Sequence, residues 1–134
     1  MKTKPVLTLE DVKNIAAGAE AEAVKNNWAV TISIVDDGGH LLWLQRMDGA
    51  APVSAWIGPQ KAITAALGRR ESAVYEKMVN EGRFSFLAVD PVTPLEGGVP
   101  IIADGQVVGA VGVSGVKSSE DVQIAKAGIA ALGF

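Results

Sequence analysis

The order of strand and helix patterns along the 134 residues predicts an α+β domain, with an antiparallel sheet and helices packed on it. Two pairs of strand-like segments are each joined by a turn of Asp and Gly residues, which is typical of β-hairpins. Helical patterns precede the first pair, separate the two pairs and follow the second. We expect residues 1–134 to form a single domain, because this length is usual for one hydrophobic core.

The first helix and the first hairpin are predicted within residues 8–46. Thr8 can cap a helix whose apolar residues recur at helical spacing, and this helix should end near residues 26–27. Over residues 28–35 apolar residues alternate with small or polar ones, which predicts a strand with one apolar face. The turn signal Asp-Asp-Gly-Gly then leads to a second strand over residues 40–46.

Two helical stretches and a loop are predicted next. Residues 54–67 are rich in alanine, but Gly58-Pro59 should either kink this helix or move its start to Pro59. A further helical stretch covers residues 71–80. No period holds over residues 81–98, and a long apolar loop of this kind is usually a lid, a binding loop or a partner surface.

A second hairpin and a last helix complete the predicted domain. Residues 99–103 and 106–114 are joined by Asp104-Gly105, and the apolar run in the second of these strands indicates a central strand covered on both faces. Residues 118–121, Ser-Ser-Glu-Asp, form a capping box that should open the last helix. Glycines recur at a spacing of three in this region, which is not a dinucleotide-binding fingerprint, and we expect them to let a helix pack closely on the strand: Gly109, Gly112 and Gly115.

Composition excludes several classes of function. The net charge of −3 provides no basic face for nucleic acid or for an anionic membrane surface. No apolar run reaches the ~20 residues of a membrane helix. The first residues lack the apolar segment of a signal peptide, so we expect a cytoplasmic protein. There is no cysteine, and the single histidine, His40, cannot supply a zinc site, so we expect no metal centre.

Arg46 and Asp48 flank the end of the second predicted strand, just before a glycine. An arginine fork in this position could hold the carboxylate of a ligand with two hydrogen bonds. The alternative is a structural ion pair between Arg46 and either Asp48 or Asp121. The sequence leaves both interpretations open.

Ser54, Lys61 and Thr64 could share one face of the alanine-rich helix, since Lys61 and Thr64 are three residues apart. A lysine in this setting could act as a base or hold an anion, whereas the alternative is a surface lysine with only its aliphatic stem covered. The residues Gly97-Gly98-Val99-Pro100 could bring backbone N–H groups against a ligand, or they could form only a turn into the strand.

His40 directly follows the first predicted turn. A histidine in such a turn is usually exposed to solvent, and the alternative is a haem or metal ligand. Tryptophans are more often anchors of a core or an interface than stacking platforms, and we expect this of all three: Trp28, Trp43 and Trp56.

Four blocks of sequence resemble, in the same order, those of the GlcG/HbpS-like family. This family is also called haem-degrading or DUF336, and it includes the C-terminal domain of PduO-type cobalamin adenosyltransferases. The resemblance extends from about Leu7 to Leu132. The blocks are residues 35–50, then Ser54 with Lys61-Ala62 and Thr64-Ala65, then residues 97–101, and finally residues 109–115 leading to Asp121 and Ala125.

The resemblance implies a profilin-like fold and a homo-oligomer in which dimers build a larger ring, a hexamer or an octamer. It also implies a ligand pocket, because some relatives bind haem and others are linked to corrinoids. Haem- and corrinoid-binding relatives can use a histidine near the first helix as an axial ligand, and this chain has none there. Carried over position by position, the pocket would include Arg46, Asp48, Ser54, Lys61, Thr64, Gly98, Pro100 and Asp121.

Three functions are compatible with these residues. The first is an oligomeric protein that binds a haem or a corrinoid, with Arg46 or Lys61 holding its carboxylates and the loop Phe84–Leu95 covering it. The second is an isomerase, hydratase or lyase for a small organic acid, in which Arg46 binds the carboxylate and Lys61 or Asp48 moves the proton. The third is a subunit or chaperone of another enzyme, with the same loop as the contact surface.

Overall fold

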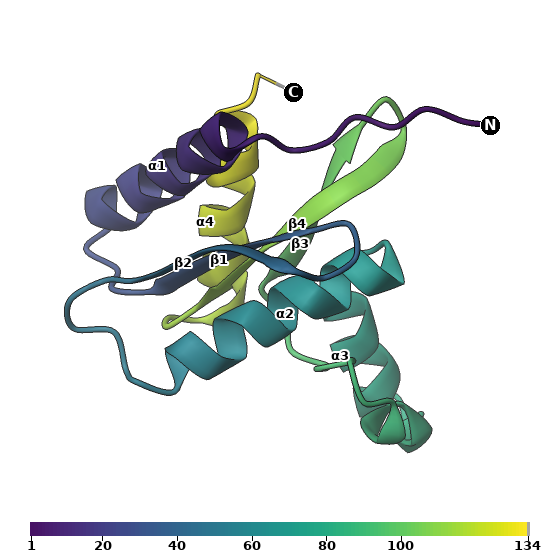
Figure 1. Cartoon of the computed structure of the whole chain (residues 1–134). Coiled ribbons are helices and arrows are strands. Elements are labelled where there is room, and N and C mark those ends of the chain that lie inside the picture. Colours follow the sequence, from purple (N-terminus) through teal and green to yellow (C-terminus); the bar gives the residue numbers. More distant parts are fainter. Residues whose placement is uncertain (134) are drawn as a thin grey trace.

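A four-stranded antiparallel sheet in the order β2-β1-β4-β3 lies at the centre of residues 1–133, which are the residues that the computed structural model describes. The last residue of the predicted domain lies outside them. Helices α1 (Leu9–Lys25) and α4 (Ser118–Ala130) cover one face of the sheet, and α2 (Ser54–Gly68) covers the other (Figure 1). The predicted α+β class is confirmed. The strands are β1 (Thr31–Asp36), β2 (Leu41–Arg46), β3 (Gly98–Ala103) and β4 (Gln106–Ser114).

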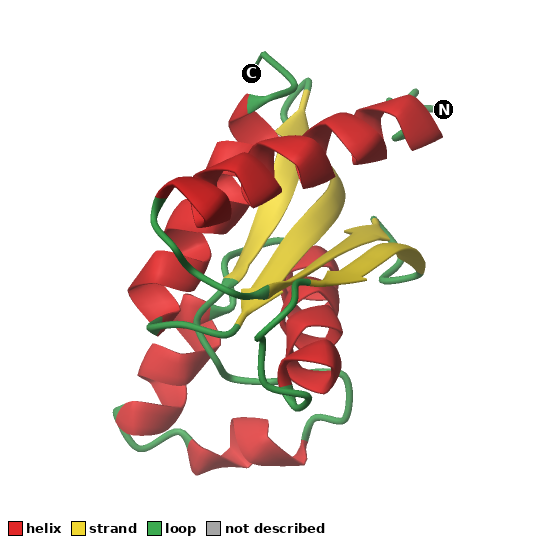
Figure 2. Cartoon of the chain, turned by 90° about the vertical axis from the view of Figure 1, so that its left-hand side faces the viewer, coloured by secondary structure: helices red, strands yellow, loops and turns green. Residues whose placement is uncertain are grey.

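Helix α1 begins at the predicted capping box. The backbone N–H of Asp11 donates to Oγ1 of Thr8 at 3.1 Å, and the N–H of Thr8 donates to Oδ2 of Asp11 at 2.9 Å. The helix lies against α4, as Figure 2 shows. The two helices approach closely because Gly128 has no side chain: a Cβ there would lie 2.8 Å from the carbonyl oxygen of Ile15.

Strand β1 is buried on both of its faces. Ile32 and Ile34 pack with apolar residues of α1 and α4, as the predicted apolar face requires. Thr31 and Ser33 point the other way and are also fully buried. The alternation in the sequence therefore predicted the strand correctly, but it did not show that the polar face lies beneath a helix.

Helix α2 begins at Ser54 and contains Pro59, so of the two alternatives left open by the sequence, the one in which the helix starts at the proline is wrong. The carbonyl oxygen of Val53 accepts the N–H groups of Trp56 and Ile57, both at 3.0 Å, which forms the first turn before the proline is reached. Gly112 of β4 lies directly under this helix, and a Cβ on it would collide with the carbonyl oxygen of Gly58. The expected role of this glycine in close helix–strand packing is confirmed.

Helix α3 (Ala73–Asn80) and a short 3-10 helix, η1 (Phe84–Ala88), form an arm that projects beyond α2 (Figure 1). The 3-10 helix lies within the segment that was expected to have no regular period. Phe84 and Leu87 are exposed by 66% and 61% on this arm. The arm therefore presents apolar side chains to the outside.

The start of α4 differs slightly from the prediction. The N–H of Lys117 donates to Oε1 of Glu120 at 3.2 Å, so Lys117 is the capping residue and Ser118 is already inside the helix. The capping box is therefore shifted by one residue: Glu120 closes the first turn, not Asp121, whose carboxylate bonds to Lys61 and to the N–H of Val116. None of the helices in residues 1–133 combines the length and the apolar character needed to cross a membrane.

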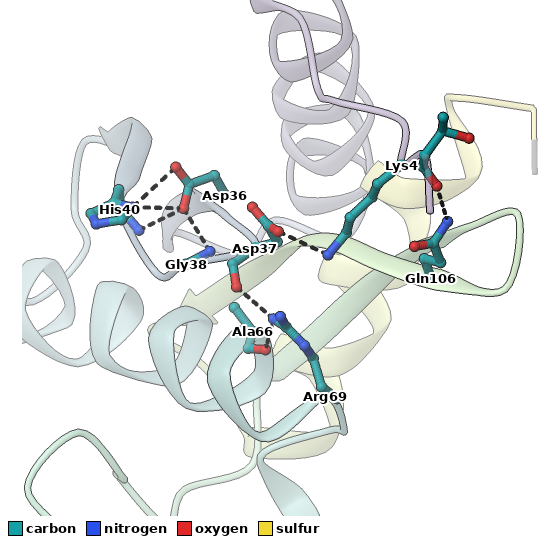
Figure 3. Close-up of polar contacts among 9 residues, drawn as sticks. Lys4, Asp36, Asp37, Gly38, His40, Ala66, Arg69 and Gln106 are labelled. Atoms are coloured by element: carbon teal, nitrogen blue, oxygen red, sulfur yellow. Dashed lines mark hydrogen bonds and ion pairs between the residues drawn. The ribbon is translucent and has the colours of Figure 1, made fainter. Parts of the chain in front are cut away.

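The segment before α1 is tied to both hairpins. The side-chain amide of Gln106 donates to the carbonyl oxygen of Thr3 at 2.9 Å, and the Lys4 ammonium lies 2.8 Å from Oδ2 of Asp37 (Figure 3). Arg69, which directly follows α2, donates to the carbonyl oxygen of the same Asp37. We call residues 3–7 the N-terminal strap.

Candidate functional site

The structure divides the predicted site residues among separate places. Arg46 and Asp48 line one open cleft. Lys61, Gly98 and Asp121 meet in a buried cluster. The remaining three make contacts of their own: Ser54 and Thr64 on α2, and Pro100, half-buried on β3 where it pairs with Ala110 of β4.

The cleft lies between α1 and the end of β2 and has a volume of about 380 Å³. Glu20 comes from the middle of α1, and the other lining residues come from the end of β2 and the chain just after it. The arm with the predicted covering loop contributes no lining residue. At this cleft, the expectation that the loop Phe84–Leu95 covers the ligand is not met. The lining residues are Glu20, Gln45, Arg46, Met47 and Asp48.

A chain of hydrogen bonds orients the carboxylate of Glu20. The indole N–H of Trp43 donates to Oε1 of Gln45 at 3.0 Å, and Nε2 of Gln45 donates to Oε1 of Glu20 at 2.7 Å. Because an indole nitrogen can only donate, Gln45 must turn its oxygen to Trp43 and its NH₂ group to Glu20. Neither Glu20 nor Gln45 was predicted, since the sequence contains no local signal that joins α1 to the end of β2.

The guanidinium of Arg46 is exposed, and within residues 1–133 no carboxylate lies within 4.0 Å of it. The alternative of a structural ion pair is therefore wrong. Asp121 pairs with Lys61 instead, and Asp48 lines the same cleft without contacting the guanidinium at that distance. The ligand-binding role of Arg46 stays a prediction.

Lys61 is buried, with only 4% of its surface exposed, so the alternative of a surface lysine is wrong. Its Nζ donates to the carbonyl oxygen of Val113 at 2.9 Å and to Oδ2 of Asp121 at 3.0 Å. The other oxygen of Asp121 accepts the N–H of Val116 at 3.2 Å. Burial raises the pKa of Asp121, although the adjacent Lys61 ammonium acts in the opposite direction. This pair connects α2 with β4 and α4.

Gly97 and Gly98 pass directly beside Lys61. A Cβ on Gly97, whose φ is +136°, would lie 2.6 Å from the Lys61 ammonium, and a Cβ on Gly98 would collide with the Lys61 carbonyl oxygen. The N–H of Gly98 donates to Oγ of Ser72 at 2.8 Å, so this group is not available to a ligand. The two glycines make room for the buried lysine.

Buried hydroxyl groups fasten the chain that returns from the arm to the sheet. Oγ1 of Thr64 accepts the N–H of Thr93 at 2.7 Å, and Oγ of Ser72 donates to the carbonyl oxygen of Leu95 at 2.6 Å. Ser72 was not predicted, because the sequence placed it inside the helical stretch of residues 71–80, whereas helix α3 begins only at Ala73. Ser54 makes a separate contact, at 2.7 Å between its Oγ and Oγ1 of Thr31.

His40 lies on the outside of the first hairpin turn, with its side chain 81% exposed, as was expected. Its Nδ1 lies 3.1 Å from Oδ1 of Asp36 (Figure 3). Across residues 1–133, no three His, Asp or Glu side chains gather as they would around a metal ion.

Comparison with known proteins assigns this α+β domain to a family. The chain belongs to the HbpS-like family, because the family model described as "Haem degrading protein HbpS-like" matches residues 7–130. The resemblance inferred from the four sequence blocks is confirmed.

Relatives of known sequence or structure agree with this assignment. Protein GlcG of Escherichia coli (strain K12) is 56% identical over 114 residues, which are 85% of each chain. A crystal structure of a double mutant of Streptomyces reticuli HbpS has a TM-score of 0.91 at 31% identity, covering 100% of this chain and 92% of that one. A crystal structure of a PduOC–heme complex has a TM-score of 0.87 at 28% identity and covers 95% of both chains.

Proposed function

We propose that this protein binds a small organic ligand through a carboxylate group, which Arg46 holds in the cleft beside α1. The observation that carries this proposal is the exposed guanidinium of Arg46, which lines the cleft and makes no ion pair within residues 1–133. A guanidinium presents a planar fork of N–H groups that matches a carboxylate. Arg46 is therefore the best-placed anion-binding group among the predicted site residues.

Haem is the first ligand to test, because one relative is a heme complex and the family is described as haem-degrading. The cleft fits one part of haem, since Arg46 can bind a propionate. It does not fit the iron well: among its lining residues only Met47 is of a type that usually serves as an axial ligand of haem, and the single histidine lies at the turn beside Asp36. A corrinoid would make a similar demand for a ligand to its metal. We therefore base the proposal on the carboxylate alone.

Two titrations test this proposal, one with haem followed by its absorbance and one with pentanoate followed by calorimetry. We expect Arg46→Gln to weaken the binding of a carboxylate ligand roughly 10-fold or more, because a hydrogen bond between charged groups is lost. Lys25→Gln removes one exposed positive charge from the end of α1 and serves as the control. Haem dimethyl ester, which has no free carboxylate, should bind wild type and Arg46→Gln alike. If Arg46→Gln binds both haem and pentanoate as tightly as wild type does, the proposal is contradicted.

An enzyme acting on a small organic acid is the second candidate, and the position of Asp48 favours it. An acid held by Arg46 would lie in the same cleft as the Asp48 carboxylate, which could accept or return a proton. Lys61, the other predicted base, already donates to Val113 and Asp121 in the buried cluster. A screen of small carboxylic acids for isomerase, hydratase or lyase activity tests this candidate. Turnover that survives in Asp48→Asn would remove Asp48 from the reaction.

We also propose that the protein forms a homo-oligomer in which dimers build a hexamer or an octamer. Large apolar side chains that remain exposed on β2 and α2 support this assembly: Leu42, Leu44, Trp56 and Leu67. Native mass spectrometry gives the number of subunits directly. A monomer at micromolar concentration would contradict the proposal, and we expect Leu44→Lys with Trp56→Ser to reduce the assembly.

A further inference from the structure

We infer that the ligand of the Arg46 cleft is a zwitterion of the amino-acid class, with its carboxylate on Arg46 and its ammonium group on Glu20. This inference rests on the proposed function, since it assumes that Arg46 binds a carboxylate. It adds the second charged group of the ligand and the residue that recognises it.

Charges of both signs line the cleft without neutralising one another. Arg46 contributes one positive charge, and Glu20 and Asp48 contribute two negative charges. Within residues 1–133 neither carboxylate lies within 4.0 Å of the guanidinium. A simple carboxylic acid would neutralise Arg46 but would bring its own negative charge towards Glu20 and Asp48. An ammonium group on the carbon next to the carboxylate gives these acidic groups a partner of opposite charge.

The carboxylate of Glu20 is held in place before a ligand arrives. Its Oε1 accepts the side-chain N–H of Gln45, which is itself oriented by Trp43. Among the hydrogen bonds of residues 1–133, none reaches Oε2 of Glu20, so this oxygen can accept a donor from a ligand. A fixed acceptor binds a cation with less loss of side-chain entropy than a freely rotating one.

Size and lining agree with a small molecule. The cleft volume of about 380 Å³ is near the lower end of the range of about 300–1,000 Å³ for ligand pockets. Met47 provides the apolar part of the lining, and its unbranched thioether can adapt to side chains of different shapes. We therefore expect recognition of the charged groups, with loose selection of the side chain.

Calorimetry with three matched compounds tests this inference. L-norvaline carries both charged groups, pentanoate lacks the ammonium group, and butylamine lacks the carboxylate. We expect wild type to bind norvaline at least ~10-fold more tightly than either of the others, because one charged hydrogen bond is missing in each case. Glu20→Gln should remove the preference for norvaline over pentanoate while leaving the binding of pentanoate intact or stronger. Glu10→Gln, an exposed acid near the start of the same helix, is the control.

The outcomes separate the inference from the proposed function. If pentanoate binds as tightly as norvaline, and Arg46→Gln weakens both, the inference is overturned and the proposed function stands. If norvaline binds but Arg46→Gln leaves its affinity unchanged, the proposed function fails as well. If wild type binds none of the three compounds at millimolar concentration, the inference is overturned, and the haem titration alone decides the proposed function. Circular dichroism of each variant confirms that it is folded.

Discussion

The Lys61 ammonium lies 3.0 Å from Oδ2 of Asp121, a residue sixty positions later in the chain. Their side chains are only 5% and 2% exposed. The pair joins helices on opposite faces of the sheet, and the bond from Lys61 to the carbonyl oxygen of Val113 fixes it to the end of β4. Two charges are thus buried away from water, and the attraction between them compensates for their lost hydration.

Removing one member of this pair should destabilise the protein strongly. We expect Lys61→Met to lower the free energy of unfolding by about 3–5 kcal/mol, because Asp121 then remains buried without a positively charged partner. The double variant Lys61→Met with Asp121→Leu should lose much less than the sum of the two single variants. Urea unfolding measures all three. Losses that simply add would mean that the two charges do not interact in the folded protein.

The glycine beside the buried pair should not accept a side chain. We expect Gly98→Ala to cost about 1–3 kcal/mol or more, because the new Cβ meets the carbonyl oxygen of Lys61, which belongs to the backbone of α2. Gly105→Asn is the matched control, since nothing lies within 4 Å of that position and asparagine tolerates its φ of +70°. Equal thermal unfolding midpoints for Gly98→Ala and wild type would refute this close approach.

The hydroxyl of Thr64 should hold the chain that returns from the arm. Thr64→Val keeps the shape of the side chain but leaves the N–H of Thr93 without its acceptor, which we expect to cost about 1–3 kcal/mol. Hydrogen exchange should become faster over residues 91–96. Thr93→Val is the control, because it removes only an exposed hydrogen bond to Gln60. Exchange that accelerates equally in both variants would argue against a special role for Thr64.

The N-terminal strap should loosen in acid. The hydrogen bond from the Lys4 ammonium lowers the pKa of Asp37 below its ordinary value of 3.8. Stabilisation by this pair is therefore present above pH 3.8 and is lost as the pH falls through the lower folded-state value. The pair is partly exposed to solvent, so its contribution is at most about 1 kcal/mol.

Hydrogen exchange of residues 3–7 at several pH values measures this loosening, after correction for the intrinsic effect of pH on exchange. Lys4→Met should remove the difference in the exchange rate of residues 3–7 between mild and strong acid. If the same difference persists in Lys4→Met, the strap is held by other contacts, such as that between Gln106 and Thr3.

Local signals account for the parts of the fold that the sequence predicted well. Thr8 and Asp11 lie three residues apart and close the first turn of α1 by themselves. Asp104 and Gly105 have the positive φ values, +51° and +70°, of a tight hairpin turn. The start of α2 was harder to predict. Pro59 alone would interrupt the helix, but the contact of Gly58 with the sheet helps to hold the helix in place.

The candidate site was only partly predictable, because its residues come from distant parts of the chain. Arg46 and Asp48 were selected from the sequence because they flank the end of a strand just before a glycine, and both line the cleft. Glu20 reaches the same cleft only because α1 packs over β2, which no local pattern shows. The partner of Lys61 was missed for the same reason, since sixty residues separate it from Asp121.

The most direct measurement is a titration of the ¹⁵N-labelled protein with L-norvaline and with pentanoate, followed through the amide signals. Ligand binding at Arg46 predicts that the amide signals of residues 45–48 and of residues around Glu20 shift most. These two groups of residues would contact opposite ends of the bound molecule. We expect these shifts to disappear in Arg46→Gln. Saturable shifts elsewhere, with none at residues 45–48, would contradict the assignment of this cleft as the ligand site.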